Sequence, residues 1–171
     1  MEIKDIQNGD LLFMRDKSPL SQAIIKSTSQ YSHVGIFFNS CIYHATKKRG
    51  VTKQDLSAYL KEEEREVFVY RYLQIEEKKV LEEAEKHLGK PYNHSFYPGE
   101  DAFYCSQYIA KILPLFSTIP MKFGDENNEV SDFWKEYYKE LGVPVPLNLE
   151  GTNPNQLSQC EKLIFVDQLF Y

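Results

Sequence analysis

The sequence lacks the long apolar segments that would place it in or across a membrane. No apolar run approaches the roughly 18 residues that a membrane-spanning helix needs. The first ten residues, MEIKDIQNGD, contain no apolar core of a signal peptide. We therefore expect a soluble protein without a transmembrane segment, cytoplasmic by default, although the mature form of an exported bacterial protein would look the same.

Cysteine and positive charge are also scarce. The three cysteines, Cys41, Cys105 and Cys160, are far apart and form no CxxC pair. An odd, dispersed set argues against a disulfide scaffold and against structural zinc. Lysine and arginine total 20 against 25 acidic residues, a net charge of -5. Nucleic acid is therefore not an expected partner.

The residues that are present describe an ordinary globular chain with many aromatics. Hydrophobic residues make up 42% and charged residues 26% of 171 positions, which is enough to bury a core. We expect one domain over residues 1–171 with an α+β fold and a mostly antiparallel sheet. Expected strands cover residues 9–14, 33–38, 41–46, 66–73 and 162–171. Expected helices cover residues 18–30, 55–65 (with Thr52 and Asp55 as a capping-box-like start), 75–88, 105–113, 131–142 and 155–160.

The stretch YSHVGIFFNSCIYHAT, residues 31–46, predicts a hairpin that carries two histidines. If residues 39–40 form a two-residue loop, cross-strand partners pair with position numbers that sum to 79. His33, Gly35, His44 and Thr46 then share one face of the sheet, with the two imidazoles as diagonal neighbours. Gly35 opposite His44 leaves room for that ring.

Cys105 lies where a loop changes to the predicted helix CSQYIAKIL. Free backbone N–H groups and the helix dipole favour a thiolate there, so we expect a thiol pKa below the usual value of about 8.5. An imidazole on the sheet could then act as its base. In this interpretation His33 deprotonates Cys105, and His44 orients His33, with Thr46 as the alternative orienting residue. Read as ordinary packing, Cys105 is a core cysteine.

These segments resemble a known family. GDLLF followed by SHVGIFF and CIYHAT is similar to the NlpC/P60 pattern, as is GKPYNHSF followed by FYCSQYIA. The histidines precede the cysteine, which is the order of the circularly permuted papain-like group that includes the YaeF/YiiX-type amidases. The resemblance implies a papain-like fold, with a sheet or small barrel packed against helices and the nucleophile at a helix N-terminus.

The resemblance also implies site residues and a function. Cys105 takes the position of the nucleophile, His33 that of the base and His44 that of the orienting residue. Tyr92 matches a tyrosine of the oxyanion hole, and Tyr104 stands where the family has aspartate. The implied activity is thiol hydrolysis of an amide bond in a peptidoglycan-type peptide, an N-acyl compound or a lipid amide, without metal or organic cofactor.

Other interpretations remain at this stage. The domain could be a lipid acyltransferase or esterase, similar to the lecithin:retinol acyltransferase group. It could also be a lipid- or peptide-binding module without catalytic activity. A zinc site of His33, His44 and Cys105 has suitable ligand types, but their spacing does not favour it. The expected partners are small amide, peptide or lipid-like substrates, and the oligomeric state is open.

Overall fold

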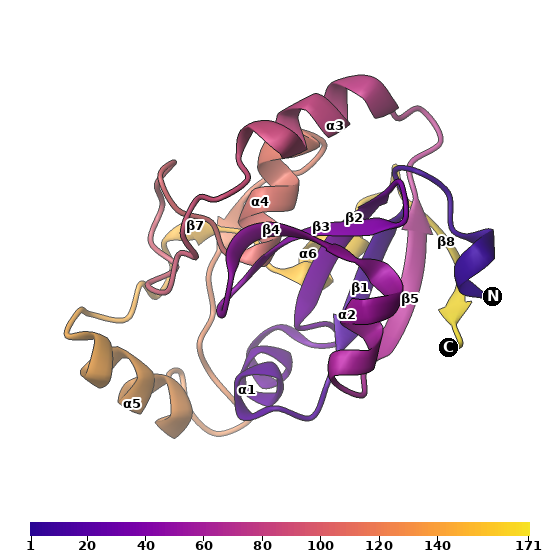
Figure 1. Cartoon of the computed structure of the whole chain (residues 1–171). Helices are drawn as coiled ribbons and strands as arrows, with labels where there is room; N and C mark the ends of the chain where they lie inside the picture. The colour runs from indigo at the N-terminus through magenta and orange to yellow at the C-terminus, as the bar shows by residue number, and fades with distance from the viewer.

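Six antiparallel strands form the central sheet of the computed structural model, which describes residues 1–171. Their order is β4-β3-β2-β1-β5-β8, so the sheet is open, with β4 and β8 at its edges (Figure 1). The strands are β1 (Leu11–Arg15), β2 (His33–Phe38), β3 (Cys41–Thr46), β4 (Gly50–Asp55), β5 (Glu66–Arg71) and β8 (Ile164–Leu169). Two short strands, β6 (Ile119–Pro120) and β7 (Glu150–Gly151), pair separately.

Six α-helices surround the sheet. Ser18 and Ser131 are the N-caps of two of them, and Gly142 ends α5 in the left-handed conformation. The helices are α1 (Pro19–Thr28), α2 (Leu56–Glu62), α3 (Glu77–Lys86), α4 (Cys105–Ile112), α5 (Asp132–Leu141) and α6 (Pro154–Ser158), after a 3-10 turn at Ile3–Asp5. This arrangement confirms the predicted α+β class with an antiparallel sheet.

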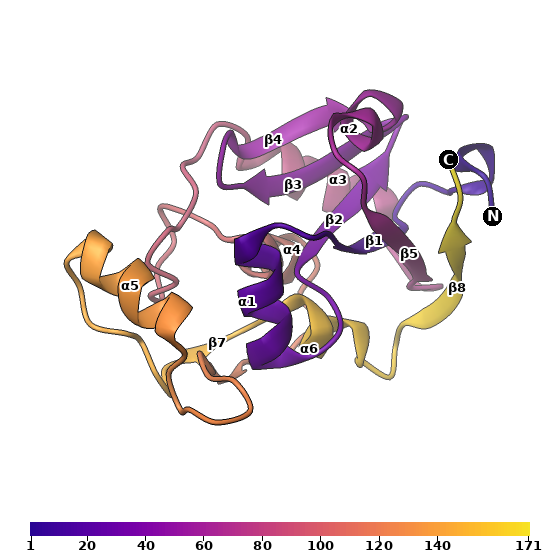
Figure 2. The ribbon, with the colours of Figure 1, turned by 90° about the horizontal axis from the view of Figure 1, so that it is seen from below.

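Each face of the sheet has its own hydrophobic core. On one face, α3 and α4 pack on residues such as Val34, Ile36 and Tyr43. On the other face, α2 packs on residues such as Met14 and Ile42. Figure 2 shows α1 and α5 as neighbours beside the sheet, where Ala23 of α1 and Trp134 of α5 belong to a third apolar cluster.

The hairpin between β2 and β3 has the predicted register. Phe38 pairs with Cys41 and Ile36 with Tyr43, so the position numbers sum to 79. Asn39 and Ser40 both have positive φ, 50° and 65°, as a two-residue type I′ turn requires. A Cβ on Gly35 would lie 2.6 Å from Ile42 side-chain atoms and 3.2 Å from Cβ of His44. A side chain at position 35 would therefore clash with Ile42 more strongly than with His44.

A buried ion pair holds the first strand to the fifth. Asp10 is fully buried, and Arg71 donates to both of its carboxylate oxygens at 2.6 and 2.8 Å. The same carboxylate accepts the backbone N–H of Gln7 at 2.8 Å. Removing either partner would leave a buried charge unpaired. Asp10 therefore has a structural role in holding these two strands together.

The segment from Gly50 to Asp55 differs from the prediction. We expected a helix that begins near Thr52, but these residues form the edge strand β4, paired with β3, and Asp55 caps α2 instead. Thr52 pairs with His44 across the ladder. The long stretch of residues 52–65 was therefore interpreted too uniformly, because its first part alternates as a strand.

The N-terminal residue contacts the last strand of the sheet. The N-terminal amino group lies 3.1 Å from Asp167 and from the backbone oxygen of Gln168, so both termini meet beside β8 (Figure 1). None of the helices is long and apolar enough to cross a membrane.

Candidate active site

Cys105 is the first residue of α4, at the end of the sheet where β2 begins. Tyr104 is the N-cap of this helix. Sγ of Cys105 lies 4.0 Å from the backbone oxygen of Ser32. The backbone N–H groups of Val34, Cys105 and Ser106 are directed at the sulfur. The sulfur thus lies among N–H donors that could also bind a developing oxyanion.

The protonation of this thiol differs from the expectation based on sequence. Burial raises the pKa of Cys105 to about 11, although the three N–H groups oppose the shift. The side chain belongs to the core cluster beneath the sheet, so desolvation of the anion outweighs the helix N-terminus. Cys105 is therefore a neutral thiol in the resting protein.

His33 and His44 meet as the register predicted. Nε2 of His33 lies 2.9 Å from Nδ1 of His44. His44 is completely buried and packs edge-on against Tyr59, with ring centroids 4.7 Å apart. Thr46, the alternative orienting residue, makes no hydrogen bond to His33. Its hydroxyl accepts the backbone N–H of Arg49 at 3.0 Å.

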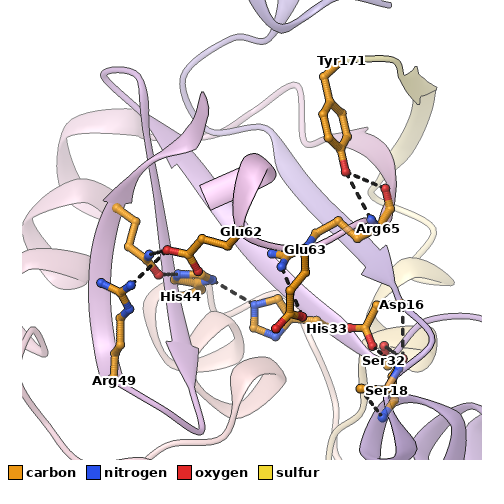
Figure 3. A network of polar contacts seen from close by, with 12 residues as sticks. Asp16, Ser18, Ser32, His33, His44, Arg49, Glu62, Glu63, Arg65 and Tyr171 are labelled. Carbon is orange, nitrogen blue, oxygen red and sulfur yellow. Dashed lines mark hydrogen bonds and ion pairs between the residues drawn. The ribbon is translucent and has the colours of Figure 1, made fainter. Parts of the chain in front are cut away.

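The hydrogen-bond chain continues beyond His44 to the surface, as Figure 3 shows. Nε2 of His44 lies 2.9 Å from Oε1 of Gln54. The Gln54 amide nitrogen donates to Glu62 at 3.1 Å, and Arg49 donates to the same carboxylate oxygen at 2.9 Å. We call His33, His44, Gln54 and Glu62 the histidine relay.

The relay has a direction that fixes the tautomer of each ring. The Glu62 carboxylate only accepts, so the Gln54 amide must turn its NH₂ toward it and its oxygen toward His44. His44 then carries its proton on Nε2 and accepts on Nδ1. His33 must therefore donate from Nε2, which leaves an unprotonated Nδ1. No hydrogen bond within the chain uses that nitrogen, so His33 has the form that a general base needs.

Cys105 and His33 line the same cavity but do not touch. No hydrogen bond joins Sγ of Cys105 to either imidazole. Both residues line an open cavity that we call the polar cavity. Its charged lining residues are Asp16, Lys47, Lys48, Arg49, Glu62, Glu63 and Arg65.

A second cavity, which we call the apolar cavity, reaches Cys105 from the other side. The two cavities share the lining residues Ile24, Ser32, Tyr92 and Cys105. Most of the exposed wall of this cavity is apolar, and the hydrophobic side chains that line it alone are Phe96, Tyr104, Ile119, Met121, Phe123 and Trp134.

The two predicted pocket tyrosines occupy different positions. Tyr92 lines both cavities, and its hydroxyl makes no hydrogen bond within the chain, so it is free for a ligand. The Tyr104 hydroxyl instead accepts the backbone N–H of Thr152 at 3.0 Å. Gln107, two residues after Cys105 on α4, lines neither cavity. It accepts the N–H of Tyr104 at 3.1 Å and donates to Gly99.

Sequence reasoning missed Gln54, Glu62 and Arg65. Gln54 lies on β4, the strand that was interpreted as the start of a helix, so its alternation with Thr52 was not used. A three-strand register would have found it, since His44 pairs with Thr52 and Gln54 lies two residues further along the same face. No comparable sequence pattern indicates that Arg65 belongs to the site.

The buried His44 and the half-buried His33 predict a loss of stability in mild acid. Burial, with a smaller effect of Arg65, lowers the pKa of His33 to about 3, and burial lowers the pKa of His44 well below its ordinary value. The unfolded chain binds these protons below pH 6.5 or so and the folded chain does not, so unfolding takes up protons. We expect the free energy of unfolding to fall by up to about 1.4 kcal/mol per pH unit for each histidine below that pH.

Urea titrations at pH 7, 6 and 5 measure this effect. A His33→Gln, His44→Gln double variant should have a flatter profile over the same range than the unsubstituted protein. A flat profile in the unsubstituted protein would show that these imidazoles are solvated.

Several known proteins and one protein family are similar to this chain. Residues 5–167 match the model of the permuted papain-like amidase family described as YaeF/YiiX. The uncharacterized protein YiiX of Escherichia coli is 28% identical over 177 residues, with 94% of this chain and 85% of YiiX covered. A crystal structure of yiiX from another Escherichia coli strain, described as a metalloprotein, superimposes with a TM-score of 0.79. That match has 28% identity and covers 95% of this chain and 97% of the other.

Proposed function

Because this chain belongs to the permuted papain-like amidase family of the YaeF/YiiX type, we propose that it is a thiol hydrolase that cleaves an amide bond through a thioester on Cys105. The observation that carries the proposal is the directed relay, which leaves Nδ1 of His33 unprotonated in the cavity that Cys105 lines. The proposed enzyme is a single domain over residues 1–171.

In the first step Sγ of Cys105 attacks the amide carbon while Nδ1 of His33 takes the thiol proton. Both pKa shifts favour the neutral thiol and neutral imidazole at rest, so the proton moves during the attack and not before it. The carbonyl oxygen becomes an anion, for which the N–H groups near the sulfur and the Tyr92 hydroxyl are the proposed donors. His33 then protonates the leaving amine as the carbon–nitrogen bond breaks.

In the second step water hydrolyses the thioester. His33 takes a proton from the water, whose oxygen bonds to the acyl carbon, and returns a proton to sulfur as the carbon–sulfur bond breaks. The products are a carboxylic acid and an amine, and the thiol is restored. His44 acts on His33 and not on substrate, because it is buried and its Nδ1 faces Nε2 of His33.

The residues do not fit a metal centre. One relative is described as a metalloprotein, but this chain has no group of three or more His, Cys, Asp or Glu side chains placed to hold a metal ion. Both nitrogens of His44 are used in hydrogen bonds, to His33 and Gln54. A zinc site of His33, His44 and Cys105 therefore has no support in the geometry, and we propose no step through a metal.

An acylation experiment tests the proposal. With p-nitrophenyl acetate, we expect a burst of nitrophenolate and the added mass of one acetyl group on Cys105, because the ester carbonyl meets the same thiol and base. Including EDTA excludes metal chemistry in the same assay. Cys41→Ser and Cys160→Ser variants provide matched controls, and each should keep the burst.

The outcome also separates the alternatives. A protein without a burst, and without label on Cys105, would be a binding module on this fold. Release of acyl groups to a second alcohol or amine, faster than to water, would identify an acyltransferase. The thiol pKa alone does not distinguish an enzyme from a binding module. Burial raises the pKa of Cys105 in both cases, even if His33 assists the attack of the thiol on a bound carbonyl.

A further inference from the structure

Cys105 lies between the two cavities, so a substrate bound at its sulfur would extend into both of them. A scissile bond at the sulfur has one substituent in the apolar cavity and the other in the polar cavity, because both cavities are lined by Cys105, Tyr92, Ser32 and Ile24. The chemistry of each cavity then describes one half of the substrate.

The apolar cavity offers few free polar partners to a ligand. The Ser106 and Thr152 hydroxyls bond to each other at 3.0 Å. The indole N–H of Trp134 donates to Ser27 at 3.1 Å, and the Tyr104 hydroxyl accepts the Thr152 N–H. With these groups paired and most of the remaining wall hydrophobic, the cavity favours a hydrocarbon group.

The polar cavity is lined by a buried cation, Arg65, two of whose nitrogens have no hydrogen-bond partner. The Arg65 side chain is only 5% exposed, and its Nε and Nη1 are buried without any hydrogen-bond partner. Its one ion contact is Nη2 to Glu63 at 3.6 Å, and the Glu63 side chain is 67% exposed. A buried guanidinium with unused donors is costly, and a carboxylate is the ligand that matches its donor geometry.

The structure holds this guanidinium beside the histidine relay. Its central carbon lies 3.9 Å from the centre of the Tyr59 ring, the ring that also packs on His44. The Tyr171 hydroxyl accepts from the backbone N–H of Arg65 and donates to its backbone oxygen, at 3.3 and 2.7 Å (Figure 3). Lys47 and Lys48 add positive charge to the same cavity wall. A ligand carboxylate would take the place of Glu63.

His33 decides which half of the substrate enters which cavity. It lines the polar cavity but not the apolar cavity, so the amine that it protonates leaves through the polar side. Resting on the proposed hydrolase activity, we propose that the substrate is an N-acyl amino acid with an apolar acyl group. The acyl chain occupies the apolar cavity, the carboxylate of the amino acid binds Arg65, and hydrolysis gives a fatty acid and a free amino acid.

The test compares two amides that differ only in this charge. N-octanoyl-L-alanine and N-octanoyl-L-alaninamide have the same scissile bond, and release of octanoic acid measures its cleavage in both. We expect kcat/KM to be at least about tenfold higher for the acid, because a charge-assisted bidentate contact is lost in the amide. N-acetyl-L-alanine should be cleaved at least about tenfold more slowly than the octanoyl compound, because most of the buried hydrocarbon is missing.

Variants locate the effect. Arg65→Gln should bring the ratio of acid to amide close to one, whereas Lys61→Gln, which removes an exposed charge from α2 outside both cavities, should keep it. Equal rates for acid and amide, or no octanoate release from a protein that p-nitrophenyl acetate acylates on Cys105, would reject the substrate class and leave the hydrolase intact. A protein that is not acylated on Cys105 would overturn both proposals.

Discussion

Replacing Cys105 with alanine is expected to reduce amide hydrolysis to the uncatalysed background, a loss on the order of 10⁴-fold or more in kcat. The thioester cannot form without the sulfur, and no other cysteine lines either cavity. His33→Ala should approach the same loss, because the neutral thiol has no other imidazole to take its proton. The double variant should be little worse than either single one, since nucleophile and base act as a unit.

Controls keep this result interpretable. Cys105 is a small side chain in the first turn of α4, so its alanine variant should remain folded, which circular dichroism and urea titration would verify. Cys160→Ala removes a thiol outside both cavities and should leave turnover unchanged. Full activity in the Cys105→Ala protein would end the proposed mechanism.

Replacing Gln54 with leucine is expected to lower kcat on the order of 100-fold with little change in KM. Leucine provides no acceptor for Nε2–H of His44, so His44 is no longer confined to one tautomer and His33 is no longer obliged to donate from Nε2. A fraction of the protein would then carry the His33 proton on Nδ1, the nitrogen that must accept from Cys105. Because Gln54 makes no proposed contact with the reacting atoms, substrate binding should change little.

Two matched variants and one spectrum make this prediction specific. Lys53→Leu changes the neighbouring residue of β4, whose side chain points to the other face toward Glu85, and should leave turnover unchanged. Glu62→Gln keeps an acceptor for the Gln54 amide but also supplies a donor, so it should lower kcat by less than Gln54→Leu does. Nitrogen-15 spectra of labelled histidines should show His33 protonated on Nε2 alone, and mixed in Gln54→Leu. A His33 ring protonated on Nδ1 in the unsubstituted protein would contradict the relay.

The parts of this site that the sequence predicts are those set by local geometry. A two-residue loop fixes strand parity, so the contact between His33 and His44 followed from counting residues. The helix start at Cys105 followed from the loop that precedes it and the apolar spacing after it. The family resemblance added the connection between these two distant segments. Membership of the family is confirmed, and the pairing of Cys105 with His33 stays a proposal.

The parts that could not be predicted depend on tertiary environment. The thiol pKa was expected to fall because a helix N-terminus is visible in sequence, whereas the desolvation that raises it depends on which side chains surround the sulfur. Gln54 was hidden because its strand lies at the sheet edge in a segment rich in charged residues. The empty donors of Arg65 are a property of the packed structure alone.

The residues of the histidine relay lie close together in the sequence, whereas Cys105 lies far along the chain from the residue that it contacts. Its contacts link residues 8 to 11 positions apart, whereas Sγ of Cys105 meets Ser32 across 73 positions. Closing a short loop costs less conformational entropy than closing a long one. The base and its supports are thus encoded within one segment of about 30 residues, His33 to Glu62, that can organise itself locally, and the nucleophile is the component that depends on the completed fold.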